Sequence, residues 1–174
     1  TRSIAVTGVQ TCALPILDCI FCQIVAGQAP CHKVWESDSH LAFLSIFPNT
    51  PGFTVVIPKQ HHGSYAFEQT DEVLSELIKA TKQVAQRLTQ ALPDVGRCGM
   101  FFEGYGVDHL HSKLMPLHGT GSSASFQRIE AMSDKFFTRY EGYLSSHDGR
   151  RADDAVLAAL AASIRGDSAA GDAV

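Results

Sequence analysis

The sequence predicts an α+β fold with an antiparallel sheet, one long amphipathic helix and additional C-terminal helices. Two apolar runs, at 33–36 and 41–46, flank the turn-forming residues 37–39, and this pattern indicates a β-hairpin. Three further apolar runs are predicted as strands, at 53–57, 98–102 and 110–115. Pro58 and Pro116 end the first and last of these strands, because proline cannot donate a hydrogen bond to a neighbouring strand.

The long helix is the most strongly indicated element. Thr70 is suited to cap its N-terminus, and Asp71 and Glu72 place negative charge at the positive end of the helix dipole. Apolar side chains recur at helical spacing at Val73, Leu74, Leu77, Ile78, Val84, Ala85, Leu88 and Leu92. Pro93 ends the helix. Shorter helices are expected within 17–27, 133–144 and 153–164.

Length and composition indicate a single domain. A chain of 174 residues with 45% hydrophobic content can bury one core. We assign the domain to residues 17–165. Residues 1–16 show no periodicity that joins them to the domain, and 166–174 are small and polar, as expected of a disordered tail.

Charge and cysteine content exclude several functional classes. A formal net charge of -4 and a pI of about 6.0 argue against binding to nucleic-acid polymers, because that binding depends on clustered Lys and Arg. Five cysteines, an odd number, in a chain of ordinary core composition favour a reducing, cytoplasmic location over a secreted disulfide framework. The sequence contains no run of 18 apolar residues, so no membrane span is predicted.

The segment 108–116 carries the clearest chemical signal. In an extended chain, side chains alternate between two faces, so His109, His111 and Lys113 share one face. Neighbours on that face are roughly 6–7 Å apart, which lets one phosphate group contact two of them. A neutral imidazole is a competent nucleophile toward phosphorus, and an adjacent cation stabilises the charge that develops on the phosphate oxygens.

The same segment resembles the motif of histidine triad proteins, His-x-His-x-His followed by apolar residues, with Lys113 in the third position. The stretches 19–27, 42–48 and 55–61 are similar to bacterial members of that family, and the likeness spans about 17–119. The resemblance implies a histidine triad fold and usually a homodimer. It also implies hydrolysis or transfer of nucleoside monophosphate groups, from phosphoramidates or dinucleoside polyphosphates, through a nucleotidyl-histidine intermediate.

The resemblance assigns catalytic roles to three residues. His111 occupies the position of the family nucleophile, and His109 is the first member of the triad. Lys113 stands where the family has a third histidine that contacts the phosphate. A lysine supplies charge there but is a poor neutral proton relay.

The resemblance also indicates where substrate binds. Phe43 and Ser45 lie in the expected nucleotide-binding stretch, and Ser45 stands where many members have an Asp that binds the ribose hydroxyls. The polar side chains that many members place before the triad have no clear counterpart. Phosphate contacts are therefore expected from backbone amides at Gly104 and Gly106.

A structural zinc site is the one cofactor expected. Cys19 and Cys22 have the spacing with which two thiolates grip one zinc ion. The resemblance supplies His61 and His109 as the other ligands, because some bacterial members and the related galactose-1-phosphate uridylyltransferases bind zinc in this way. Zinc would attach the N-terminal segment to the sheet. The remaining histidines, His32, His40, His62, His118 and His147, are expected at the surface or in loops.

Two other functions remain open at this point. Lys113 and Ser45 together suggest a nucleotide-binding scaffold that has lost turnover. Alternatively, His109 and His111 chelate one catalytic zinc, since histidines two apart on a strand can share a metal. For Cys19 and Cys22, the alternative to a zinc site is that both are buried side chains that bind no metal.

Overall fold

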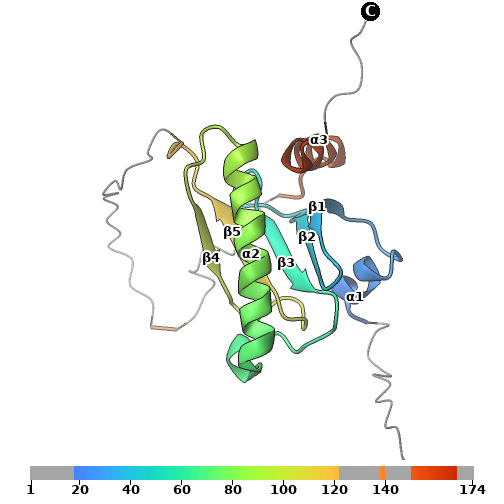
Figure 1. Cartoon of the computed structure of the whole chain (residues 1–174). Helices are drawn as coiled ribbons and strands as arrows, with labels where there is room; N and C mark the ends of the chain where they lie inside the picture. The colour runs from blue at the N-terminus through green and yellow to red at the C-terminus, as the bar shows by residue number, and fades with distance from the viewer. Residues whose placement is uncertain (1–17, 122–137, 140–149, 168–174) are drawn as a thin grey trace, which may run out of the picture.

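The computed structural model describes residues 18–121, 138–139 and 150–167. Within them the predicted α+β fold is confirmed, as a five-stranded antiparallel sheet in the order β1-β2-β3-β5-β4 (Figure 1). The elements are α1 (Ile20–Val25), β1 (His32–Glu36), β2 (His40–Leu44), β3 (Thr54–Pro58), the 3-10 helix η1 (Ala66–Glu68), α2 (Asp71–Ala91), β4 (Cys98–Phe101), β5 (Ser112–Pro116) and α3 (Asp154–Arg165). No helix in these ranges is long and apolar enough to cross a bilayer.

Three predictions about the ends of the chain fall wholly or partly outside the described residues. The N-terminal segment 1–16 lies outside them, and of the predicted helix 133–144 only 138–139 are described, as exposed bend residues. The predicted tail 166–174 is described only at its first two residues. Gly166, in the left-handed conformation, and Asp167 both donate backbone hydrogen bonds to the last turn of α3, so they cap this helix.

The hairpin and the long helix are confirmed. Strands β1 and β2 pair antiparallel with Lys33 opposite Phe43 and Glu36 opposite Leu41. The hydroxyl of Thr70 accepts a hydrogen bond from the Val73 amide at 3.4 Å, which caps α2 as its sequence predicts. In Figure 1, α2 lies along the sheet, and α3 lies beside the β1 and β2 end.

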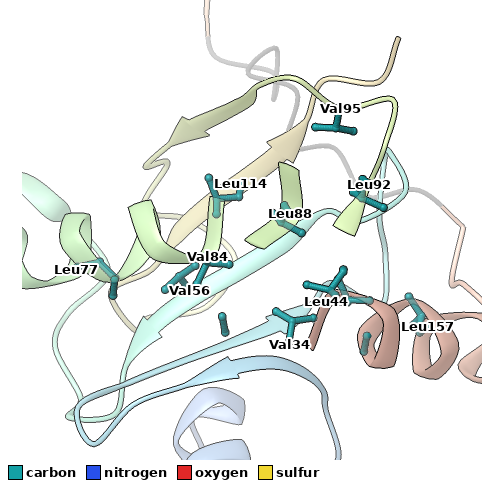
Figure 2. Packing of buried hydrophobic residues seen from close by; sticks show 14 of the residues in the cluster. Val34, Leu44, Val56, Leu77, Val84, Leu88, Leu92, Val95, Leu114 and Leu157 are labelled. Carbon is teal, nitrogen blue, oxygen red and sulfur yellow. The ribbon is translucent and has the colours of Figure 1, made fainter. Parts of the chain in front are cut away.

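The main core lies between the sheet and α2. Leu77, Val84 and Leu88 of α2 are fully buried against Val56 of β3 and Leu114 of β5 (Figure 2). Residues Leu157, Ala161 and Ile164 of α3 extend the same core. One face of α2 thus fixes the position of β3 and of β5, the strand that follows the histidine-rich segment.

The opposite face of the sheet forms a second apolar cluster. Leu41, Phe43, Val55 and Ile57 alternate along β2 and β3 with the residues of the main core. Phe21, Ile24 and Val25 pack on this cluster, so α1 covers the second face. The two sides of the sheet therefore meet different elements, α2 on one and α1 on the other.

The strand predicted at 110–115 begins later than expected. Strand β5 starts at Ser112, whose pairing with Val56 is the last residue pair between β3 and β5. Pro58, the last residue of β3, has no amide hydrogen, so it cannot donate a further hydrogen bond to β5. Instead the Leu110 amide donates to the carbonyl of His62 at 2.8 Å. The histidines therefore lie in the chain that enters β5.

We expect Leu88→Ala to destabilise the fold by about 2–5 kcal/mol, because the Leu88 side chain has no exposed surface and its truncation leaves a cavity. Ile78→Ala is the matched control on the same helix. Its side chain is 45% exposed, and its loss is expected to cost within about 0.5 kcal/mol. Urea unfolding followed by circular dichroism measures both. Equal losses would contradict the assignment of the core face of α2.

Candidate functional site

Four potential metal ligands lie together where α1 meets the chain entering β5. Cys19, Cys22, His61 and His109 each offer one atom, and these atoms all lie within 4.8 Å of one another. Cys19 immediately precedes α1 and Cys22 lies within it, so one short helix supplies both thiols. The predicted ligand set is thus brought together and could hold a metal ion.

The distances inside this cluster suit a tetrahedral site. The Nδ1 atom of His109 lies 3.5 Å from the Sγ atoms of both Cys19 and Cys22, and Nδ1 of His61 lies 3.3 Å from Sγ of Cys22. Zinc bonds of about 2.3 Å to sulfur and 2.0–2.1 Å to nitrogen at a tetrahedral angle place the two ligand atoms roughly 3.5 Å apart. These three distances, and the residue types present, therefore fit a zinc ion.

The rest of the His109 ring is also fixed. Its Nε2 donates to the carbonyl of Pro58 at 2.8 Å, which leaves Nδ1 with the lone pair that a metal requires. The ring has no exposed surface, and this burial lowers the pKa of His109 to about 4. The imidazole is accordingly neutral near pH 7.

The His111 ring carries the opposite hydrogen-bond arrangement. Its Nδ1 lies 2.7 Å from the carbonyl of His109, and because a carbonyl only accepts, Nδ1 carries the proton. The lone pair is therefore on Nε2. Nε2 has no hydrogen-bond partner among the described residues. It is not fully buried, so it keeps contact with solvent.

Burial keeps the His111 ring uncharged. The residue is only 3% exposed, and desolvation lowers its pKa below the ordinary imidazole value. The ring of Phe21, from α1, packs edge-on with its centroid 5.5 Å away. Phe21 also packs edge-on against Phe43 at 5.4 Å. The Phe21 ring thus contacts both the His111 ring and the Phe43 ring.

Lys113 lies two residues further along, on β5. Its ammonium forms an ion pair with the Glu103 carboxylate at 2.8 Å and lies 5.8 Å from the centre of the Phe101 ring. The charges of Lys113 and Glu103 act on the pKa of His111 in opposite directions, the first lowering and the second raising it. Glu103 was not predicted as a site residue, because an acidic side chain before a glycine turn is ordinarily solvated.

The loop between β4 and β5 lies beside the metal cluster. Gly104 and Gly106 both have positive φ, and the Gly104 carbonyl accepts a hydrogen bond from the Ser64 hydroxyl at 2.9 Å. Gly106 lines a cavity of about 350 Å³ together with Cys19, His61 and Asp108. This cavity adjoins the metal cluster, and His111 is not one of its lining residues.

The remaining predicted substrate residues lie on or just after β2. Phe43 is buried on the α1 side of the sheet, in contact with Phe21. Ser45 directly follows the strand, where its hydroxyl accepts a hydrogen bond from the Phe47 amide at 3.2 Å. Phe43 therefore lies on the His111 side of the sheet, whereas the Ser45 hydroxyl is engaged in a local turn.

One expectation about the other histidines is wrong. His40 is buried at the start of β2. This strand lies between β1 and β3, and all of its residues are buried. It lines a separate cavity of about 210 Å³ with His62, Glu72 and Glu76. His118 lies in the loop after β5, as expected, and bonds to Asp94 and to the Pro51 carbonyl.

Fold and site together define an α+β protein in which His109 and His111 directly precede β5, a strand inside the sheet. The HIT domain model matches residues 26–120, more than half of the chain, and the chain belongs to this family. The resemblance to histidine triad proteins is thereby confirmed, with the motif at His109 and His111 inside the matched range.

Known proteins with similar sequences or folds agree with this placement. The chain is 35% identical over 108 residues to Protein hit of Bacillus subtilis, covering 60% of this chain and 74% of that protein. It is 36% identical over 104 residues to adenosine 5'-monophosphoramidase hnt1 of Schizosaccharomyces pombe, covering 58% and 74%. The solved structure of a Zn-bound histidine triad family protein from Mycobacterium smegmatis aligns with a TM-score of 0.60 at 20% identity, over 90% of this chain and 100% of that one. At that identity the structural likeness supports the fold alone.

Proposed function

We propose that the chain hydrolyses or transfers nucleoside monophosphate groups through a covalent intermediate on Nε2 of His111. The observation that carries the proposal is the hydrogen bond from His111 Nδ1 to the His109 carbonyl, which leaves Nε2 as the nucleophilic atom. The 36% identity to a fungal adenosine 5'-monophosphoramidase supports a phosphoramidate or a related nucleotide anhydride as substrate.

The chemistry has two displacement steps at phosphorus. In the first, Nε2 of His111 forms a bond to the α-phosphorus, and the amine or polyphosphate leaves with the bonding electron pair, the amine taking up a proton from solvent. In the second, water attacks the nucleotidyl-histidine, releases the nucleoside monophosphate and restores the imidazole. The Lys113 ammonium and the backbone amides of the loop at 104–106 stabilise the phosphate oxygens in both steps.

Substrate reaches His111 from the α1 side of the sheet. Phe21 and Phe43 form an apolar platform for the nucleoside, and Ser45 lies at the end of the same strand as Phe43. The Phe21 ring turns away from His111 as the phosphate enters.

Zinc is the proposed occupant of the Cys19, Cys22, His61 and His109 cluster. Two thiolates and two imidazoles with four-coordinate spacing form a closed structural set, with no position left for substrate. When bound, zinc supplies a cross-link between α1 and the chain that enters β5. Cys19 and Cys22 thereby fix the His109 backbone, whose carbonyl orients His111.

A homodimer is the proposed assembly. Strand β4 lies at the edge of the sheet, and its Met100 side chain is 46% exposed. An edge strand has unpaired amides and carbonyls that a second copy of the same strand can satisfy. A partner at this edge would lie next to the loop at 104–106.

The alternative of a catalytic zinc held jointly by His109 and His111 has little geometric support. Both His109 nitrogens are already engaged, Nδ1 in the cysteine cluster and Nε2 at the Pro58 carbonyl. Nδ1 of His111 is engaged as well, at the His109 carbonyl. The scaffold alternative keeps its two supporting observations, Lys113 in the third triad position and Ser45 in place of an acidic residue.

We expect His111→Ala to lower kcat for adenosine phosphoramidate by about 10³-fold or more, because the nucleophilic atom is lost. In wild type, mass spectrometry after rapid acid-free quenching should show one AMP on the peptide that contains His111. His118→Ala is the matched control, since His118 lies in the loop after β5 and bonds only to Asp94 and Pro51. Turnover by wild type with no adduct on His111 would contradict the covalent mechanism, and binding without turnover would favour the scaffold.

We expect Cys22→Ser to lower the zinc content from one ion per chain to nearly none, because a hydroxyl is a poor ligand in a thiolate site. Loss of bound zinc should destabilise the protein by about 3–4 kcal/mol when free zinc stands at 100 to 1000 times its dissociation constant. Elemental analysis and thermal unfolding measure the two effects. Cys98→Ser is the control, because Cys98 lies on β4, where burial raises its thiol pKa to about 11. Equal zinc in both variants would exclude this site, and zinc loss in His111→Ala would favour the catalytic-zinc alternative.

A further inference from the structure

The ion pair between Lys113 and Glu103 differs from the other ion pairs in the described part of the chain. Its side chains are only 15% and 10% exposed, whereas every other pair has at least one partner more than a third exposed. Removing two charges from water costs free energy that a surface pair does not pay. Stability alone therefore does not explain an ion pair with so little solvent exposure.

The location of the pair supplies that reason. Lys113 lies on β5, two residues after His111, and Glu103 lies in the β4–β5 loop directly before Gly104. The ammonium lies near the face of the Phe101 ring, on the neighbouring strand. Three groups from two strands and one loop thus meet at the Lys113 ammonium, two residues along the chain from the proposed nucleophile.

We propose that Glu103 is a positioning residue that holds the Lys113 ammonium beside His111, so that the ion pair, and not Lys113 alone, takes the place of the missing third imidazole. This inference rests on the proposed function of His111. In this role Glu103 does not contact the phosphorus. Its carboxylate fixes where the positive charge of Lys113 is held.

The need for such a residue follows from the difference between the two side chains. A histidine has two side-chain torsions and places its ring close to the backbone. A lysine has four torsions and a strongly hydrated ammonium, and it loses considerable rotamer entropy when it is held in one place. A hydrogen-bonded carboxylate at 2.8 Å holds one N–H of Lys113 and leaves the other two for phosphate oxygens. The charge is then in place before the transition state forms.

This arrangement has an electrostatic consequence for substrate binding. A carboxylate close to an anionic substrate repels it and offsets part of the attraction exerted by Lys113. Loss of Glu103 therefore removes repulsion in the ground state and removes the positioning that the transition state requires. The Michaelis constant should stay equal or fall while kcat falls, which a general loss of structure does not produce.

A double-mutant cycle tests the coupling between the two residues. We expect Glu103→Ala and Lys113→Met each to lower kcat by about 10²-fold, the size of losing one aimed donor. The double variant should be no slower than Lys113→Met alone, because the proposed effect of Glu103 on kcat passes through the ammonium. Losses that multiply in the double variant, or a kcat for Glu103→Ala within twofold of wild type, would overturn the inference.

Further variants separate positioning from folding. Glu103→Gln keeps the shape and one acceptor oxygen, so it should retain more kcat than Glu103→Ala; equal loss in the two would contradict positioning by hydrogen bond. Lys113→Arg keeps the cation and should recover part of kcat only while Glu103 is present. Glu76→Gln is the matched control, since Glu76 and Lys79 form an exposed ion pair of similar length, 2.7 Å, on α2. All rates are measured below the lowest unfolding temperature of the set.

The outcome of this test is separate from that of the proposed function. AMP bound to His111 in wild type establishes the covalent mechanism whatever the cycle shows. If the adduct forms and the two losses multiply, the covalent mechanism stands and the positioning role fails. If wild type forms no adduct and turns nothing over, the proposed function fails first, and this inference fails with it.

Discussion

The His109 residue is the constraint on which the site depends. Its Nδ1 faces the two thiols at α1, its Nε2 donates to the Pro58 carbonyl at the end of β3, and its own carbonyl accepts from His111. One residue thus connects the N-terminal helix, a central strand and the proposed nucleophile. Because the ring is fully buried, an unsatisfied nitrogen would be costly, and the hydrogen-bond pattern admits one tautomer.

The α2 side of the sheet holds β5 independently of the metal cluster. The Thr81 hydroxyl donates to the Leu77 carbonyl at 2.7 Å, so its contact of 2.6 Å with Ser112 is made by the Ser112 proton. This buried pair joins the middle of α2 to the first residue of β5. With Leu110 and Leu114 in the core on either side of Ser112, the chain cannot slip by one residue without burying a histidine under α2. Side chains therefore alternate between the two faces of the sheet already at 109–111, before β5 begins at Ser112.

Periodicity predicted the elements whose side chains pack on one face. The α2 stripe and the hairpin followed from spacing and turn residues, because burial of one face against a core imposes that spacing. The start of β5 did not, since it depends on Pro58, a residue more than fifty positions earlier in the chain. His40 was misjudged for the same reason: its burial comes from neighbouring strands on both sides of β2. Side-chain partnerships across loops, such as Glu103 with Lys113, leave no periodic trace in a sequence.

His109 and His111 were predictable as site residues because their chemistry depends on local spacing. Which of them serves structure and which is suited to react was not. Two histidines two positions apart suggested either a shared metal or a nucleophile with a helper. Hydrogen bonding separates them: both nitrogens of His109 are engaged with the protein, whereas His111 keeps Nε2 unpartnered among the described residues. A residue fixed at both nitrogens serves structure, and a residue with an open nitrogen is suited to react. The His109 carbonyl links the two rings: it belongs to the residue whose ring is fixed, and by accepting the hydrogen bond from His111 Nδ1 it orients the His111 ring.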